Sequence, residues 1–200
     1  MRPRPICVRL TAMTVFQNVQ KGLIPARLTV ADVYALQEAG VISEGENFEL
    51  IEGEIVPMAA AKFSHHEWMK SRLNEALVLA KPADTALFVE PSVALSEITF
   101  VEPDIAIWPR TIESQEVRGP DLLLVIEVAV SSIGYDLRVK ARLYAEACVR
   151  EYWVVDAVRK TIRVHRDPVE GAYCDVREYE AHDTVSAMLP SIAIRLDTLD

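Results

Sequence analysis

An almost continuous apolar run covers residues 121–132, which read DLLLVIEVAVSS. A run of this length between Gly-Pro and Ser-Ser is typical of a strand that is buried on both faces. Residues 136–148 then place apolar side chains at helical spacing, and residues 152–156 form a second short apolar run. This order predicts a βαβ unit in which the two strands are parallel neighbours in one sheet.

Outside this unit the pattern predicts further short elements. In chain order they are a helix from the N-cap Thr29 to Gly40, a hairpin over 48–58 with Glu52-Gly53 at its turn, an amphipathic helix at 64–81, strands at 86–95 and 100–108, and antiparallel edge strands at 161–166 and 173–180. Ser64 and Glu67 have the spacing of a capping box, which favours a structural role for Glu67. The whole pattern predicts an α/β fold with a mixed sheet, flanking helices and antiparallel edge hairpins.

The length of 200 residues, half of them hydrophobic, favours one globular domain, which we expect at 28–200. Residues 1–27 are expected to be a flexible leader, because Arg9 interrupts the apolar stretch that a signal peptide requires. Met1 is the expected translation start, with Met13 as the alternative. No apolar segment approaches the roughly 18 to 20 residues that span a bilayer.

The three cysteines are widely spaced and contain no CxxC pair, which argues against a disulfide framework or a zinc site and favours a reducing, cytoplasmic setting. A net charge of −9 argues against a nonspecific coat on nucleic acid, because such binding depends on Lys and Arg. The charge is uneven, however. Residues 31–61 hold seven acids and no Lys or Arg, whereas residues 136–166 hold eight Lys or Arg against four acids. A local basic surface is therefore compatible with the acidic total.

Glu127 is the one charge inside the apolar run 122–130. A carboxylate in a core is tolerated only when it is paired, hydrogen bonded, bound to metal or protonated. Glu127 is therefore a candidate site residue. The structural alternative is a buried ion pair with an arginine.

Two other residues fit a site around Glu127. Asp104 lies in the apolar segment VEPDIAIW, and Lys140 lies on the predicted helix after the Glu127 strand. Two carboxylates and an amine are the parts of a metal-dependent phosphodiester hydrolase, in which oxygen ligands hold Mg²⁺ and a cation stabilises the developing charge. The main-chain carbonyl of Val128 is a further candidate ligand. By itself Asp104 also fits a strand edge or turn, and Lys140 also fits a solvated helix surface.

At this point the chain resembles a known family. The ordered segments that carry the resemblance are FELIEGEIV, a histidine at the head of the following helix, VEPDIAIW, LLLVIEVAVSS, YDLRVKARLY and REYWVVD. This series is similar to the Uma-two family of restriction-endonuclease-like proteins, which is assigned to the PD-(D/E)xK nuclease superfamily. The resemblance covers residues 28–190.

The resemblance implies a restriction-endonuclease-like core and places Asp104 and Glu127 at the metal-binding acids. The usual lysine position, two residues after the glutamate, is Ala129 here. Lys140 matches a lysine that has moved to the following helix, and Glu49 matches an additional acidic position. The resemblance also brings in His65, with His66 as the weaker candidate.

Asp136 and Tyr144 lie in helical register with Lys140, so Asp136 is expected to orient the lysine and Tyr144 to pack beside it. We therefore expect a Mg²⁺- or Mn²⁺-dependent endonuclease that acts on DNA, with a homodimer as the expected assembly. The alternative is a nucleic-acid-binding or regulatory module that keeps the fold without turnover. A third interpretation is an interaction protein in which Glu127 only pairs with an arginine.

Overall fold

The computed structural model describes residues 27–43, 45–58 and 64–199. Of the expected leader, residues 1–27, only Arg27 is described. The candidate start residues Met1 and Met13 therefore lie outside the described residues. Within the described part of the chain, no helix is long and apolar enough to cross a membrane.

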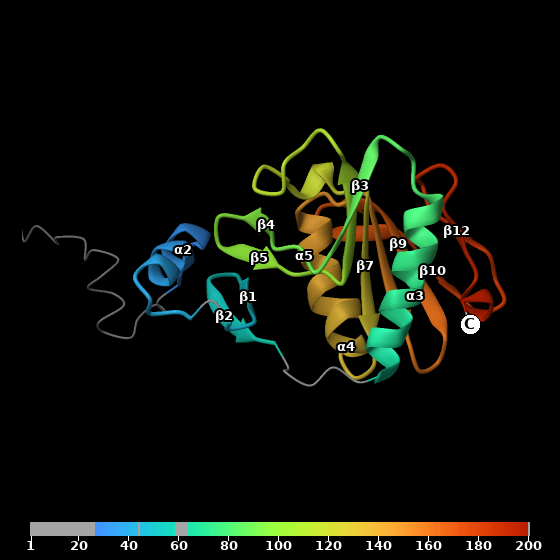
Figure 1. The fold of residues 1–200 in the computed structure, drawn as a ribbon, viewed down its shortest axis with the longest axis horizontal. Coiled ribbons are helices and arrows are strands. Elements are labelled where there is room, and N and C mark those ends of the chain that lie inside the picture. The colour runs from blue at the N-terminus through green and yellow to red at the C-terminus, as the bar shows by residue number, and fades with distance from the viewer. Residues whose placement is uncertain (1–26, 44, 59–63, 200) are drawn as a thin grey trace, which may run out of the picture.

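The centre of the fold is a six-stranded mixed sheet (Figure 1). In spatial order its strands are β10 (Ala172–Tyr179), β9 (Thr161–Val169), β8 (Glu151–Asp156), β7 (Leu124–Ala129), β6 (Ile105–Pro109) and β3 (Thr85–Val89). β7 and β8 are parallel, as the βαβ pattern predicts, and the other neighbours are antiparallel. The expectation that 161–166 forms an edge strand is wrong, because β9 pairs with both β8 and β10.

A smaller four-stranded sheet stands at one end of the molecule beside α2 (Val30–Glu38) (Figure 1). Its strands, in spatial order, are β2 (Glu54–Pro57), β1 (Phe48–Ile51), β5 (Thr99–Val101) and β4 (Val93–Ser96). The expected hairpin is present, with positive φ angles of 51° at Glu52 and 85° at Gly53. Two successive positive φ angles match the tight turn that the twist of a hairpin favours.

The two strands expected at 86–95 and 100–108 are each divided between the two sheets. β3 and β6 pair in the large sheet, whereas β4 and β5 pair in the small one. Each break falls at a Glu-Pro pair, Glu90-Pro91 or Glu102-Pro103. Proline has a fixed φ and no N–H to donate, so it interrupts a ladder at these points. The chain therefore bends twice at one place, between the two sheets.

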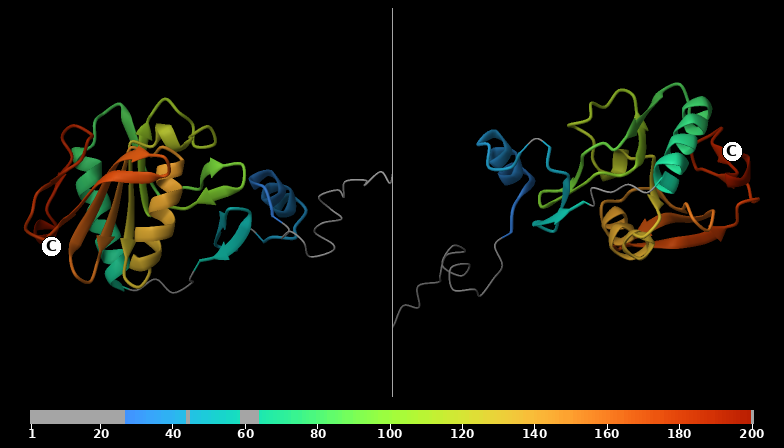
Figure 2. Two further views of the ribbon diagram at one scale, coloured as in Figure 1. Left: turned by 180° about the vertical axis from the view of Figure 1, so that it is seen from behind. Right: turned by 60° about the horizontal axis from the view of Figure 1, so that its bottom comes forward.

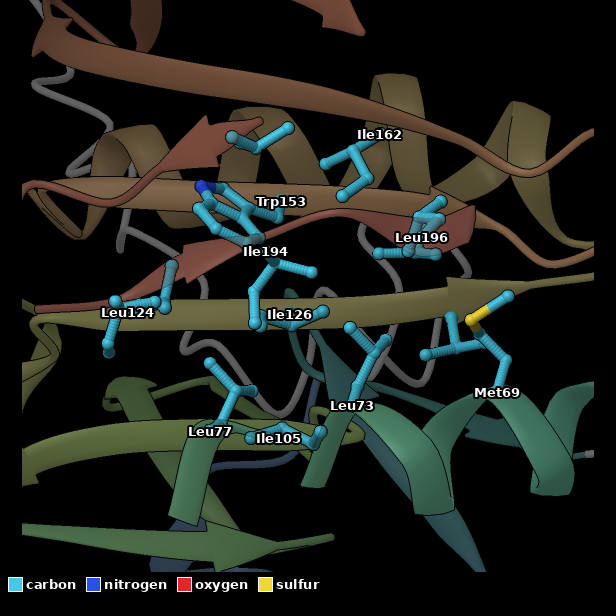
Figure 3. Packing of buried hydrophobic residues seen from close by; sticks show 14 of the residues in the cluster. Met69, Leu73, Leu77, Ile105, Leu124, Ile126, Trp153, Ile162, Ile194 and Leu196 are labelled. Carbon is cyan, nitrogen blue, oxygen red and sulfur yellow. The ribbon is translucent and has the colours of Figure 1, made fainter. Parts of the chain in front are cut away.

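Helices cover both faces of the large sheet (Figure 2). α3 (Ser64–Ala80) lies on one face, where Met69, Leu73 and Leu77 pack against strand residues and the C-terminal segment (Figure 3). The opposite face carries α4 (Ile133–Tyr135), the π-helical turn η2 (Asp136–Lys140) and α5 (Ala141–Glu146). The remaining short elements are η1 (Gly119–Asp121), β11 (Val185–Ser186), β12 (Ala193–Ile194) and η3 (Leu196–Thr198).

Strand β7 sends alternate side chains to the two faces. Ile126 and Val128 join the core under α3, whereas Val125 and Ala129 join the core under α5. Because successive side chains point to opposite faces, Glu127 faces the α5 side. The helix predicted there as a regular α-helix contains the π turn instead, and such turns occur frequently at functional sites.

Candidate active site

A cavity of about 480 Å³ opens where the small sheet meets the ends of β6 and β7. Its ionisable carboxyl and basic side chains come from both sheets, from α3 and from η2. They are the acids Glu49, Glu90, Glu102, Asp104, Glu127 and Asp136, and the bases His66 and Lys140. The excess of carboxyl groups makes this cavity suited to a cation.

Asp104 and Glu127 are brought together by the register of β6 and β7. Ile105 pairs with Ile126, so one further step of this antiparallel ladder sets Asp104 opposite Glu127. Side chains directly opposite each other in such a ladder are close neighbours. The Asp104 carboxylate also accepts a hydrogen bond of 2.8 Å from the main-chain N–H of Val128. Asp104 is thus fixed to the strand that carries Glu127.

Glu127 belongs to a buried group that we call the deep cluster, formed by Glu49, Glu127, Lys140 and Tyr144. Lys140 Nζ lies 2.8 Å from Glu127 Oε1 and 2.8 Å from Glu49 Oε1. The Tyr144 hydroxyl donates a 2.9 Å hydrogen bond to the same oxygen of Glu127. The arginine pair considered as an alternative for Glu127 is therefore wrong, since the partner is Lys140.

Burial dominates the electrostatics of the deep cluster. It raises the pKa of Glu127 to about 8, against the lowering effect of Lys140, and the charges of Asp104, Asp136 and Glu49 add to the rise. Burial opposes the charge on Lys140, but Glu127 and Glu49 outweigh it and raise the pKa of the ammonium group. Lys140 therefore stays charged, and the pKa of Glu127 is shifted from the acidic range toward neutral pH.

A second polar group lies beside Asp104, and its members come from α3 and from the residue that follows β3. We call it the rim cluster; it consists of His66, Glu67, Lys70 and Glu90. His66 Nε2 lies 3.2 Å from both oxygens of Asp104, and its Nδ1 lies 3.1 Å from Glu67. Lys70 Nζ lies 2.7 Å from Glu90, 3.0 Å from Glu67 and 3.9 Å from Asp104. Glu67 thus contacts His66 and Lys70. Its role in a capping box stays a prediction, because the side chain of Ser64 lies outside the described residues.

The structure sets His66, rather than the favoured His65, against the site. His66 shares a helix face with the buried residues Met69, Lys70 and Leu73. Residues three, four and seven positions apart lie on one side of a helix. Because Met69 and Leu73 pack against the sheet, His66 is turned toward the sheet as well. His65 is one position away, is exposed and does not line the cavity. The hydrogen bond to Asp104 raises the pKa of His66, against the lowering effect of burial.

Two auxiliary residues have contacts that differ from the expected ones. Asp136 accepts a 2.7 Å hydrogen bond from Ser132 Oγ, and it acts on Lys140 through its charge. Tyr144 packs in the core, as expected, but also bonds to Glu127. Ala129, at the usual lysine position, is fully buried in the apolar core, and Lys140 reaches Glu127 from the neighbouring helical turn instead.

The donor groups fit a hard divalent cation. Mg²⁺ is commonly bound through one or two carboxylates, with water and substrate phosphate completing its ligands. Asp104 and Glu127 can supply the two carboxylates. Among the described residues, no group of three or more His, Cys, Asp or Glu side chains is arranged to hold a metal. Asp104 and Glu127 are thus the two side chains whose chemistry and position fit such a cation.

Comparison with known proteins supports this description of the fold. The sequence model of the Uma2 family, described as "Putative restriction endonuclease", matches residues 30–197. A crystal structure of a putative nuclease belonging to DUF820 from Anabaena variabilis ATCC 29413 superposes with a TM-score of 0.63. The two chains are 14% identical over 86% of this chain and 97% of the other. At this identity the likeness shows a shared fold.

A search of curated proteins found no match. The family match spans most of the chain and includes both metal-ligand candidates, the deep cluster and the bends between the two sheets. The chain therefore belongs to the Uma2 family.

Proposed function

We propose that this protein is a Mg²⁺- or Mn²⁺-dependent endonuclease that hydrolyses phosphodiester bonds in DNA. The observation that carries the proposal is the meeting of three residues in one acidic cavity. Asp104 comes from the bend before β6, Glu127 from β7 and Lys140 from the π turn. Family membership supports the reaction class. The metal and the polymer are inferred from the chemistry of the cavity.

Asp104 and Glu127 would hold the metal, which when bound polarises a phosphoryl oxygen and activates water. The Val128 carbonyl is a third candidate ligand. Its N–H points to Asp104, and the N–H and C=O of one strand residue face the same neighbour. The next carbonyl, that of Ala129, accepts from Ala157 on the opposite side. This alternation supports a Val128 carbonyl that faces the Asp104 side.

Lys140 would stabilise negative charge on the phosphate. Its ammonium group has three donors, and Glu49 and Glu127 each take one, which leaves one donor for a substrate oxygen or a water. Glu49 is fixed in turn by a 3.0 Å hydrogen bond from the Glu102 N–H. In this arrangement Glu49 holds Lys140 in place and is positioned to orient water.

We also propose a homodimer as the working form, because cutting both strands of a duplex requires two such sites. The alternative, a module that keeps the fold without turnover, is favoured by one observation. Lys140 already compensates Glu127 and Glu49 when no metal is bound.

Cleavage of supercoiled plasmid separates the two proposals. The wild type should nick or linearise the plasmid in the presence of Mg²⁺ or Mn²⁺, and EDTA should stop the cleavage. Glu127→Gln should be folded but should not cut the plasmid. Glu151→Gln is the matched control, because Glu151 is a fully buried strand carboxylate outside the cavity, held by Trp153 and Arg166. A wild type that cuts neither DNA nor RNA with any divalent ion would favour the inactive module.

A further inference from the structure

The hydroxyl of Tyr135 is buried and has no hydrogen-bond partner among the described residues. Tyr135 forms part of the cavity wall beside Asp136 and Lys140. Buried polar groups are almost always paired with protein, water or a ligand, and an unpaired one requires an explanation. An unsatisfied donor on the wall of a proposed active site points to a ligand oxygen.

The local backbone fixes where this tyrosine stands. Tyr135 is the last residue of α4, and its N–H donates a 2.7 Å hydrogen bond to the Ser132 carbonyl. The π turn begins at the next residue and ends at Lys140. A π turn closes its hydrogen bonds over five residues, so it brings residues five apart nearer to one side than an α-helix does. Tyr135 and Lys140 therefore line the same cavity.

The hydroxyl is a donor at neutral pH. Burial raises its pKa, and the nearby charge of Glu49 raises it further, against the lowering effect of Lys140. The neighbouring carboxylates already accept from other groups: Glu49 from Lys140 and Glu102, Glu127 from Lys140 and Tyr144, and Asp136 from Ser132. None of these contacts involves the Tyr135 O–H, which has no partner among the described residues and would gain one from a ligand oxygen in the cavity.

We propose that Tyr135 is a substrate-binding residue whose hydroxyl donates a hydrogen bond to a phosphate oxygen of the bound nucleic acid. The inference rests on the proposed nuclease function, because the surrounding carboxylates would repel a phosphodiester unless a divalent cation compensates them. The cation and the Lys140 ammonium group would draw the phosphate into the cavity, and Tyr135 would fix its orientation.

Tyr135→Phe tests this assignment with two readouts. The first is the melting temperature of the metal-free protein, which should stay unchanged or rise by about 2–4 °C because an unpaired polar group is removed. The matched control is Tyr173→Phe. Tyr173 is also partly buried, lies outside the cavity and donates a 2.9 Å hydrogen bond to the Val149 carbonyl, so its loss should lower the melting temperature.

The second readout is affinity for a fluorescent DNA duplex in Ca²⁺, measured by anisotropy. Tyr135→Phe should weaken binding about tenfold, as expected for the loss of a hydrogen bond to a charged oxygen, and should leave Mn²⁺ affinity unchanged. Tyr173→Phe should bind the duplex as the wild type does.

The outcomes separate this inference from the function on which it rests. If the wild type binds Mn²⁺ and DNA but Tyr135→Phe binds DNA equally well, the inference alone is wrong. The same holds if Tyr135→Phe lowers the melting temperature as much as Tyr173→Phe does, because the hydroxyl then serves the fold. If the wild type binds neither Mn²⁺ nor DNA, the proposed function and the inference fail together.

Discussion

Two buried lysines stand in the polar region of this protein, and they differ in the acids that surround them. The side chains of Lys140 and Lys70 are 7% and 8% exposed. The partners of Lys140 are buried as well, with Glu49 at 4% and Glu127 at 6%. The two nearer partners of Lys70 remain in contact with water, with Glu67 at 45% and Glu90 at 38%, whereas the third, Asp104 at 3.9 Å, is 11% exposed.

The difference shows that the exposed fraction of a lysine does not by itself predict how much stability is lost when that lysine is removed. The burial of its carboxylate partners matters as well. Removing one partner of a buried pair leaves an uncompensated charge in a poorly solvated place. Carboxylates that keep their contact with water are compensated by the solvent instead. The deep cluster should therefore be sensitive to single changes and the rim cluster tolerant of them.

The largest expected effect is that of Lys140→Met. At pH 9, above the pKa of about 8 that Glu127 has in the folded protein, this change leaves Glu49 and Glu127 buried without a cation and should lower the free energy of unfolding by about 3–5 kcal/mol. Lys70→Met, the matched variant in the rim cluster, should cost about 1 kcal/mol. Urea denaturation of the metal-free proteins measures both values. Equal losses would remove the contrast between the two clusters.

A compensated variant sharpens the same contrast. Adding Glu49→Gln and Glu127→Gln to Lys140→Met removes the buried charges together, and replacing a whole buried ion group is often nearly neutral. The triple variant should recover most of the loss, to within about 1 kcal/mol of the wild type. Urea denaturation again gives the value. A triple variant no more stable than Lys140→Met would mean that shape, rather than charge, sets the cost.

The pKa of Glu127 predicts how metal binding depends on pH. A cation requires the ionised carboxylate, so binding must displace the proton that Glu127 holds below its pKa of about 8. Mn²⁺ affinity should therefore rise about tenfold for each pH unit from 6 to 8 and level off above that. Calorimetry in buffers of different ionisation enthalpy should also show proton release. A flat profile from pH 6 to 9 would contradict the shifted pKa.

The same group links stability to pH in the metal-free protein. The folded pKa of Glu127 lies above its ordinary value of 4.5, so protonation favours the folded state. This contribution is complete below pH 4.5 and is lost as the pH rises through about 8. Glu127→Gln should remove this part of the pH dependence.

The smallest expected effect concerns His66 in the rim cluster. Its bond to Asp104 raises its pKa above the ordinary 6.5, so the stability it contributes is complete below pH 6.5 and is lost as the pH rises through the folded pKa. An NMR titration of the imidazole should give a midpoint above 6.5, and His66→Gln should cost about 1 kcal/mol or less at pH 6. A midpoint below 6.5 would show that burial outweighs Asp104.

The sequence predicted the site residue whose burial is energetically costly, and it placed that residue's cation on the next element. Glu127 interrupts a buried strand, which is unusual for a carboxylate, and the βαβ pattern placed Lys140 on the following helical segment. The meeting of Asp104 and Glu127 follows from the register of two antiparallel strands, which is a tertiary property. The double bend was readable in principle, because proline stands in each expected strand.

Other parts of the site carry no signal in the local pattern. His65 and His66 are adjacent and chemically identical, so only the orientation of α3 distinguishes them. Tyr135 carries no sequence signal as a site residue, since the α-helical period separates it from Lys140 by about 140°. The π turn removes much of that separation, and no residue pattern in the segment predicts such a turn. Lys70 is a single lysine on an amphipathic helix, and its burial follows only from the packing of α3 on the sheet.

The central claim is that Asp104 and Glu127 form one divalent-metal site beside Lys140. Calorimetric titration with Mn²⁺ at pH 8 tests it most directly, with Asp104→Asn as the comparison, since asparagine can still accept the Val128 N–H bond. We predict one binding site in the wild type and affinity at least about 100-fold weaker in Asp104→Asn. No binding in the wild type, or equal binding in both proteins, would contradict the account.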